Sequence, residues 1–319
     1  MKKALIAYPI VMLCLLYNFA GCTKNKDEFI ETDLFAEAET FPVLVNIDSI
    51  LRLETIAPIP FPKSGKYNCN IAKLYKEPVL YNNGSDKDVI VKVDKAPPPG
   101  KFYAWPMGLA IDVNNGSINV SASQGGYKYT VGYVKNGTKD TCLQDIIIAG
   151  ASYKDSIYIL GNNDTLAFPY FNANPASVSV CDASDDDDYH DPIRHGNDKC
   201  EFDGEDHHGK GGHAAAKHVK VRTISGAINL KRTLEEGALG SADPVNGQGL
   251  VVPVYYQLQD QGNKAIQKIN VQLIYYKSKS DIPAALRDYI IRKQTSINTF
   301  SLLSPYGNPR PPLIVITRS

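Results

Sequence analysis

Short segments rich in β-branched and aromatic residues recur from residue 41 onward, each bounded by turn-forming residues. They include 89–93, 127–133 and 156–160, and clusters of Asn, Gly and Pro separate them. β-branched and aromatic side chains favour strands, whereas Asn, Gly and Pro favour turns. No apolar period typical of a helix occurs in this part of the chain. The sequence therefore predicts an all-β fold made of two β-sandwich domains.

The same strand signals return in the last third of the chain, where one helical segment interrupts them. Strands are expected at 219–224, 251–258, 269–276 and 313–317. From Asp281 the apolar residues recur at the spacing of one helix face, and Asp281 can cap that helix. These apolar positions are Ile282, Ala285, Leu286, Tyr289 and Ile290. We expect a helix packed on the second sandwich, and a partner-binding helix is the alternative.

One hairpin-like stretch carries the most informative signal for the fold. Residues 108–112 and 115–120 have the pattern of two strands, and Asn115-Gly116 favours the positive φ angles of a two-residue turn. The stretch resembles immunoglobulin-like and cadherin-like domains of bacterial surface proteins, in which a strand written Gly-x-Tyr-x-Val follows the hairpin. Here that strand is 126–131, and the resemblance covers residues 106–149. It implies a β-sandwich and specifies no ligand.

A weaker copy of this stretch lies 110 residues further along the chain (225 − 115). Residues 225–230 follow the pattern of residues 115–120, and Gly237 follows the second copy as Gly125 follows the first. A displaced match of this kind predicts an internal repeat, and therefore two related domains.

The N-terminus has the pattern of an export signal. Lys2 and Lys3 precede an almost wholly apolar run, residues 4–19, which is short for a membrane-spanning helix. The run ends in Phe19-Ala20-Gly21-Cys22, which resembles the lipobox of bacterial lipoproteins. The resemblance implies cleavage after residue 21 and lipid attachment to Cys22. An ordinary secretory signal and an uncleaved anchor are the alternatives.

Residues 22–41 are polar and acidic, and we interpret them as a tether between the membrane and the fold. The stretch Lys26-Asp27-Glu28 resembles the export signal of surface lipoproteins in the Bacteroidetes group. This resemblance implies an outer-membrane protein, anchored through the lipid on Cys22 and facing the cell exterior. A periplasmic face is the alternative.

Charge limits the classes of partner. The chain has 34 Lys+Arg and 34 Asp+Glu residues, and loss of residues 1–21 removes two lysines, leaving 32 against 34 and a net charge of −2. A near-neutral chain without a basic stripe argues against nucleic acid as a partner. Hydrophobic residues make up 43% of the chain, which is enough to fill the cores of two domains.

Four cysteines remain once the signal peptide is removed and Cys22 takes lipid. Disulfides persist outside the cytoplasm, and four cysteines allow three pairings. We expect Cys181–Cys200, which would close one acidic loop, and Cys69–Cys142 within the first domain. Buried thiols are the alternative for either pair.

Residues 176–218 concentrate acidic residues and contain all six histidines. Carboxylates suit Ca²⁺, and imidazoles suit Zn²⁺ and similar ions. The alternating acids resemble the start of a calcium loop but lack its glycine and its final glutamate. The candidate ligands are Asp182, Asp186, Asp188, His190, His195, His207, His208 and His213. We expect an exposed loop between the domains, and weak ion binding, a defined calcium site and a zinc-type site stay open.

Aromatic residues suggest a second kind of binding surface. Tyr103 and Trp105, the latter the only tryptophan, lie between a Pro-rich turn and the hairpin-like stretch. Exposed rings would stack on sugars, whereas buried rings would belong to the core.

Enzyme signatures are missing from the sequence. It contains no His-Glu-x-x-His, no Gly-x-Ser-x-Gly, no Gly-rich phosphate loop and no dinucleotide fingerprint. A glycosidase with two dispersed carboxylates would leave no such motif, so it is the remaining enzymatic alternative.

These observations predict a non-catalytic, lipid-anchored surface protein that binds or adheres to an extracellular glycan or protein. The alternative is an accessory glycan-binding lipoprotein of a nutrient-uptake system. The predicted parts are a signal peptide (1–21), a tether (22–41), a first β-sandwich (42–175), an acidic, His-rich loop (176–218) and a second β-sandwich with the helix (219–319).

Overall fold

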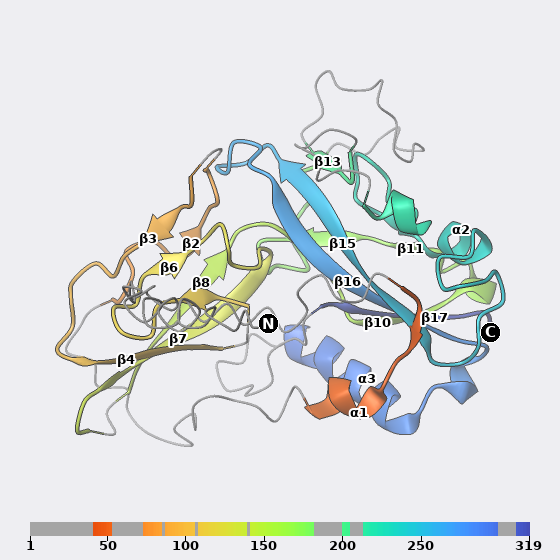
Figure 1. Cartoon of the computed structure of the whole chain (residues 1–319), viewed down its shortest axis with the longest axis horizontal. Coiled ribbons are helices and arrows are strands. Elements are labelled where there is room, and N and C mark those ends of the chain that lie inside the picture. Colours follow the sequence, from red (N-terminus) through yellow and green to blue (C-terminus); the bar gives the residue numbers. More distant parts are fainter. Residues whose placement is uncertain are drawn as a thin grey trace, which may run out of the picture.

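Strands dominate the described part of the chain, which confirms the predicted all-β class (Figure 1). The computed structural model describes residues 41–52, 73–84, 87–105, 108–138, 141–181, 200–204, 213–298 and 311–319. Within these ranges seventeen strands form several sheets, and only one of the three α-helices is longer than six residues.

The first half of the chain forms two sheets. The larger contains, in order across the sheet, β2 (Val79–Leu80), β8 (Thr141–Ile148), β7 (Tyr127–Lys135) and β4 (Gly100–Trp105). The smaller contains β3 (Ile90–Val91), β6 (Ile118–Asn119) and β5 (Ala110–Ile111). Every second residue of β7 from Tyr127 to Tyr133 is buried, because alternate side chains of a strand point to the same face.

A further sheet joins strands from distant parts of the chain. Its order is β1 (Val43–Leu44), β15 (Gln248–Leu258), β16 (Gln267–Tyr276), β17 (Leu313–Thr317) and β10 (Ser156–Ile159), and β13 (Cys200–Phe202) also pairs with β15. β1 and β10 come from the range predicted as the first domain, and β13 comes from the range predicted as a loop. The sheet therefore draws strands from both predicted domain ranges.

Small elements complete the described structure. β9 (Ala151–Tyr153) pairs with β12 (Pro169–Phe171), and β11 (Leu166–Ala167) pairs with β14 (Ile228–Asn229). The remaining elements are α1 (Ile47–Arg52), α2 (Leu230–Glu235), α3 (Ala284–Asn298) and the 3-10 helices η1 (Leu160–Asn162), η2 (Ala215–Lys217) and η3 (Lys279–Asp281).

One hydrophobic core contains residues from both halves of the chain. Tyr129 and Val131 of β7 belong to it together with Val254 and Tyr256 of β15, and all four are fully buried. The Tyr256 hydroxyl also accepts a hydrogen bond of 3.0 Å from the backbone N–H of Ala151. This contact ties the sheet of the second half to β9.

The predicted C-terminal helix is present as α3. Leu286, Tyr289 and Ile290 are buried in a second apolar cluster together with Ile282, whereas Ala285 is exposed. α1 contacts α3, and the two helices lie side by side in Figure 1.

The predicted helix cap at Asp281 is wrong. Asp281 ends η3, and its carboxylate accepts hydrogen bonds from the backbone N–H and the hydroxyl of Ser278. α3 begins only after Pro283, whose carbonyl accepts the N–H of Arg287. Proline suits this place because the first turn of a helix needs no N–H donor.

The predicted internal repeat is confirmed by strand pairing. Ile111 pairs with Ile118 in the first copy, and Val221 pairs with Ile228 in the second. A third strand extends each hairpin in the same way: β3 pairs with β6 in the first copy, and β11 pairs with β14 in the second. Each turn is closed by equivalent backbone hydrogen bonds, Gly116 to Asp112 and Gly226 to Arg222 among them.

The turn of the first copy is longer than the predicted two residues. Residues 113–116 connect Asp112 to Ser117, and within this turn only Gly116 has a positive φ, of 72°. The carboxylate of Asp112 accepts the backbone N–H groups of Asn114 and Asn115. This side-chain contact stabilises a wider turn, in which Asn115 does not need a positive φ.

The two copies diverge after the repeat. The side chain of Asn119 accepts the N–H of Ala122, and that of Asn229 accepts the N–H of Arg232, but a helix, α2, follows only in the second copy. Gly237 follows the end of α2, so the predicted match between Gly237 and Gly125 is wrong.

The C-terminal strand β17 lies against β16 as β2 lies against β8. Both pairs are parallel, and a proline precedes the paired residues in each. The N–H of Ile147 donates to the carbonyl of Pro78 over 2.8 Å, and that of Gln272 donates to Pro312 over 2.9 Å. In the second copy β10 then pairs with the far side of β17.

Candidate functional site

β13 interrupts the stretch that was predicted as a single loop. Phe202 is fully buried, and its ring stacks on Tyr256 with 5.5 Å between ring centroids. Phe202 pairs with Tyr256 as Phe102 pairs with Tyr133 in the first copy. The loop prediction is therefore wrong for β13, because the repeat requires a core strand at this place.

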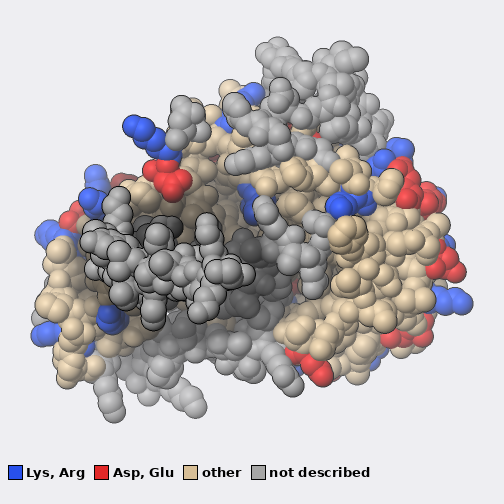
Figure 2. Space-filling model, in the orientation of Figure 1, with Lys and Arg blue, Asp and Glu red and all other residues tan. Residues whose placement is uncertain are grey.

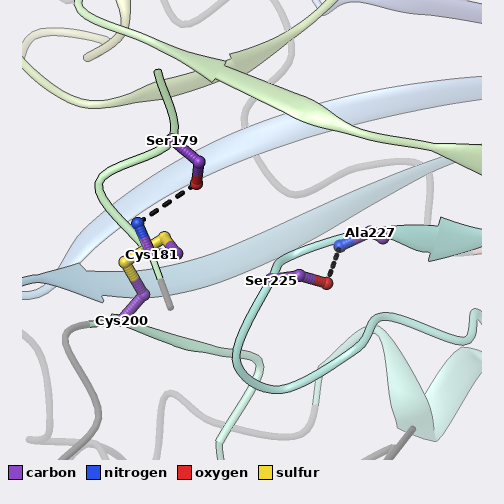
Figure 3. Close-up of a disulfide and its surroundings, with 5 residues drawn as sticks. All are labelled: Ser179, Cys181, Cys200, Ser225 and Ala227. Atoms are coloured by element: carbon purple, nitrogen blue, oxygen red, sulfur yellow. Dashed lines mark hydrogen bonds between the residues drawn. A yellow bond between two sulfur atoms is a disulfide. The ribbon is translucent and has the colours of Figure 1, made fainter. Parts of the chain in front are cut away.

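A disulfide joins the two ends of the stretch before β13 (Figure 3). Cys181 and Cys200 are 19 residues apart in sequence and 5.2 Å apart at Cα, and this is the pairing expected from the sequence. The N–H of Cys181 also donates to the hydroxyl oxygen of Ser179 over 3.1 Å. Residues 182–199, between these cysteines, lie outside the described residues.

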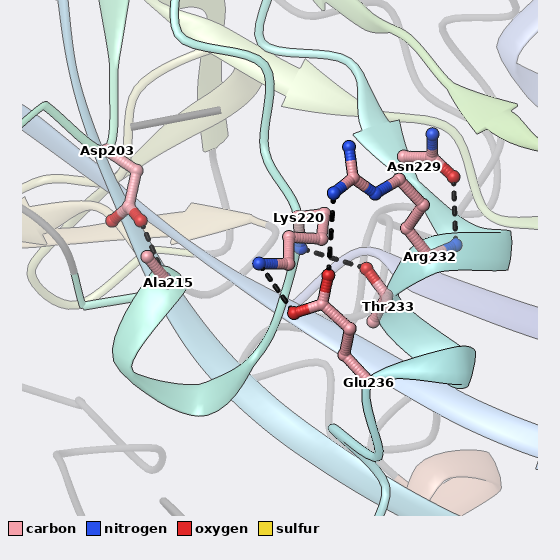
Figure 4. Close-up of polar contacts among 7 residues, drawn as sticks. All are labelled: Asp203, Ala215, Lys220, Asn229, Arg232, Thr233 and Glu236. Atoms are coloured by element: carbon pink, nitrogen blue, oxygen red, sulfur yellow. Dashed lines mark hydrogen bonds and ion pairs between the residues drawn. The ribbon is translucent and has the colours of Figure 1, made fainter. Parts of the chain in front are cut away.

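A carboxylate joins the two ends of the stretch after β13. Asp203, which is 3% exposed, accepts the backbone N–H of Ala214 over 3.0 Å. It also accepts the backbone N–H of Ala215 over 2.8 Å, as Figure 4 shows. Residues 205–212, between these contacts, lie outside the described residues. The sequence analysis missed this contact. The Asp203-Gly204 dipeptide signals a turn but does not identify the distant donors.

Polar contacts then fix the chain between η2 and α2 (Figure 4). Lys220 donates its backbone N–H to Thr233 over 2.9 Å, and its ammonium group lies 2.6 Å from the Glu236 carboxylate. The guanidinium of Arg232 lies 3.7 Å from the same carboxylate. Such ion pairs at a partly exposed surface contribute at most about 1 kcal/mol each, so they mainly orient α2 against this segment.

Only one of the predicted metal ligands is among the described residues. The other candidate ligands lie outside the described residues: Asp182, Asp186, Asp188, His190, His195, His207 and His208. The predicted lipid site Cys22 and the predicted disulfide cysteine Cys69 also lie outside them. His213 is described, and its ring centroid lies 5.0 Å from that of Tyr255. Within the described ranges no three His, Cys, Asp or Glu side chains form a group that could hold a metal. The Ca²⁺ or Zn²⁺ site therefore stays a prediction.

Only one cysteine of the second predicted disulfide is among the described residues. Cys142, in β8, is disulfide-bonded, and it is 8% exposed in the core. Cys69, its expected partner, is outside the described ranges, so the pairing itself stays a prediction.

Trp105 is part of the protein interior. It ends β4 and is 6% exposed, and no residue in the described ranges accepts a hydrogen bond from its buried indole N–H. Of the two alternatives for Trp105, the buried core ring is therefore the one that holds. Tyr103, two residues earlier, is half-buried and pairs with Gly132 of β7.

Two buried carboxylates bind backbone groups. Asp155, 2% exposed, accepts the N–H of Leu313 over 2.7 Å, which ties β17 to the start of β10. Asp203 plays the comparable role beside β13. Half-buried Asp260 accepts the N–H of Gly262 over 2.7 Å, and burial raises the pKa of this carboxyl above its ordinary value although that hydrogen bond lowers it.

Two comparisons with known proteins found no match. No known family profile matches it, and no curated protein matches it. Among solved structures, human protocadherin-24 (EC1-2) is similar over 65% of this chain and 97% of its own, with 8% identity and a TM-score of 0.19. A likeness this low supports no conclusion about function, and the all-β class rests on the strands described above.

Proposed function

We propose that the chain is a lipid-anchored outer-membrane protein that faces the cell exterior and binds an extracellular glycan or protein without catalysis. The lipobox-like residues 19–22 and the polar residues that follow support the anchor. Among the helices in the described ranges, none is long and apolar enough to cross a membrane.

The observation that carries the binding role is the attachment of two acidic, His-rich stretches to one core strand. The Cys181–Cys200 disulfide holds the first at the start of β13, and Asp203 holds the second just after its end. Binding residues are often found on loops positioned by a rigid scaffold, which is the arrangement that β13 provides.

The accessory glycan-binding alternative loses its main support. It depended on exposed rings at Tyr103 and Trp105, and Trp105 is buried. A glycosidase would use carboxylates that are available to a substrate, whereas those of Asp155 and Asp203 accept backbone N–H groups.

The anchor is tested by metabolic labelling with an alkyne-tagged fatty acid. We expect labelling of the natural chain, none of Cys22→Ala, and removal of the protein from intact cells by added protease. A chain that is labelled yet protected from protease would contradict only the exterior face.

The binding role is tested with purified mature protein on an array of glycans and extracellular matrix proteins. The test variant replaces residues 182–199 with a Gly/Ser segment of equal length and keeps both flanking cysteines. A control variant replaces Asn136-Gly137, a turn outside this region. We expect loss of binding only in the test variant; equal signals from all three proteins would contradict the role of the loops.

A further inference from the structure

Four large apolar side chains are exposed around β1, and we call them the β1 patch. Phe41, Val43, Leu44 and Val245 are 70%, 37%, 68% and 61% exposed. They are half of the eight large apolar residues that are exposed in the described ranges. In Figure 2 the surface over β1, at the right of the molecule, is uncharged, and charged side chains lie around its margin.

Backbone contacts hold the members of the patch together. Val43 and Leu44 pair with Gly249 and Gln248 of β15. The next residue, Val45, donates its N–H to the carbonyl of Gly247 over 2.9 Å, so the turn that carries Val245 lies beside β1. Adjacent strand residues point to opposite faces, so Val43 and Leu44 flank the sheet edge that β1 forms, and the patch follows this edge of the folded sheet.

A cation lies at the border of the patch. The ammonium group of Lys217 is 4.8 Å from the centroid of the Phe41 ring. Apolar side chains next to a basic residue suit the boundary between acyl chains and anionic headgroups.

The patch begins a short distance along the chain from the proposed lipid anchor. Residues 23–40, which are 18 residues (40 − 22), separate Cys22 from Phe41. Whatever their conformation, 18 residues span at most about 60 Å, so a lipid on Cys22 keeps Phe41 within that distance of the membrane. Tethering also raises the local concentration of the patch at that surface, so that weak attraction is sufficient.

The opposite end of β15 carries the proposed binding region. β1 pairs with β15 at Gly249, whereas β13 pairs with it at Leu258, nine residues further along. Nine strand residues span about 30 Å. Figure 1 shows β13 and β1 at opposite ends of this strand. Contact between the patch and the membrane would direct the stretches held by β13 away from the bilayer.

We propose that the β1 patch is a membrane-docking surface that lies on the anionic lipid headgroup layer to which Cys22 is anchored. This inference rests on the proposed lipid anchor. Docking restricts the orientation of the protein, which a tether alone does not do.

The test uses the lipidated mature chain in vesicles of phosphatidylethanolamine and phosphatidylglycerol that contain a lipid spin-labelled near its headgroup. A polarity-sensitive fluorophore is attached at Val245→Cys, in the patch, or at Val178→Cys, which is 90% exposed and lies elsewhere. We expect a blue shift and quenching for the label at position 245 and neither for the label at position 178.

A paired substitution tests the cause. Phe41→Ser with Leu44→Ser should weaken docking about tenfold or more, since two large apolar side chains lose their burial in lipid. It should therefore abolish the quenching at position 245. Phe168→Ser, at a phenylalanine that is 56% exposed outside the patch, should leave the quenching unchanged.

The failures are distinguishable. A chain that does not float with the vesicles contradicts the lipid anchor, and the docking proposal falls with it. A chain that floats but is quenched equally little at both positions overturns the docking proposal alone. A blue shift at position 245 that persists in detergent and comes with a dimer assigns the patch to a second copy of the chain, and also overturns it.

Discussion

The hydroxyl of Tyr153 donates a hydrogen bond of 2.7 Å to the carbonyl oxygen of Gly226. The first copy of the repeat contains the same contact, in which Tyr75 donates to Gly116 over 2.6 Å. Both tyrosines are fully buried and precede their turns by more than forty residues. Each turn is therefore held by a distant part of the chain and not only by its own two strands.

Removal of this hydroxyl should destabilise the fold. Tyr153→Phe leaves the buried carbonyl of Gly226 without its donor, so we expect the free energy of unfolding to fall by about 1–3 kcal/mol. Tyr75→Phe should cost a similar amount. Tyr103→Phe, at a half-buried tyrosine of β4, should change it by less than about 0.5 kcal/mol. Urea denaturation measures all three, and equal midpoints would show that the contact contributes nothing.

The turn glycines should not tolerate a side chain. At Gly226, where φ is +69°, an added Cβ would lie 2.7 Å from the Phe202 ring, and at Gly116 it would lie 2.6 Å from the Phe102 ring. Gly226→Ala and Gly116→Ala should each cost about 2–4 kcal/mol, because backbone strain and overpacking add.

Gly137→Ala separates these two causes. Its φ of +73° is equally strained, but no described atom beyond its own chain neighbours lies within 4 Å of the added Cβ. We expect a cost of about 1 kcal/mol from strain alone. A cost at Gly226 no larger than that at Gly137 would show that the phenylalanine ring moves aside without penalty. Thermal unfolding of the three variants gives the comparison.

Loss of the Cys181–Cys200 disulfide should destabilise the folded state by about 3 kcal/mol, as expected for a closed loop of 19 residues. The double variant Cys181→Ala with Cys200→Ala gives this value from chemical denaturation without reductant. Addition of reductant to the variant should then report only on Cys142 and its partner. A variant as stable as the natural chain would mean that β13 holds its place through Phe202 alone.

Asp260 should make stability depend on pH. Because burial raises the pKa of its carboxyl, the folded state binds this proton more tightly than the unfolded state does. Its stabilising contribution is present below the unfolded pKa and is lost as pH rises through the folded pKa. Asp260→Asn keeps the acceptor for Gly262 and removes the charge.

We therefore expect Asp260→Asn to raise the melting temperature at neutral pH and to give no gain at pH values below the ordinary aspartate range. Asp164→Asn, at an exposed aspartate, serves as the control and should show little change at either pH. A melting temperature of Asp260→Asn that exceeds the natural value by the same amount at every pH would contradict the assignment to this carboxyl.

Local patterns predicted the elements that depend on local chemistry. The alternation in β7 and β15, the apolar face of α3 and the match between the two turns are visible in the sequence, and each appears in the structure. The prediction that Asp281 caps the helix is wrong although its signal is local, because the helix begins only after Pro283.

The sequence did not predict which distant strands pair with one another. The alternating residues of β10 suit either half of the chain, and only the contact with β17 places them in the second sheet. β13 has three residues among acids and glycines, so its strand character depends on β15 and on the burial of Phe202. The sequence did not predict the β1 patch for the same reason. Val245 is about 200 residues from β1 in sequence, and only the fold brings it beside that strand.

The central position of β17 affects the order in which the protein can fold. β17 lies between β16 and β10, all five of its residues are buried, and every other described strand precedes it in the chain. Because a ribosome releases the N-terminal part of a chain first, the first copy receives its parallel strand, β2, before the rest of that copy is made. The second copy waits for β17, which is made after its other strands. Until β17 emerges, β10 and β16 have unpaired edges and exposed apolar faces. Chaperones bind surfaces of this kind.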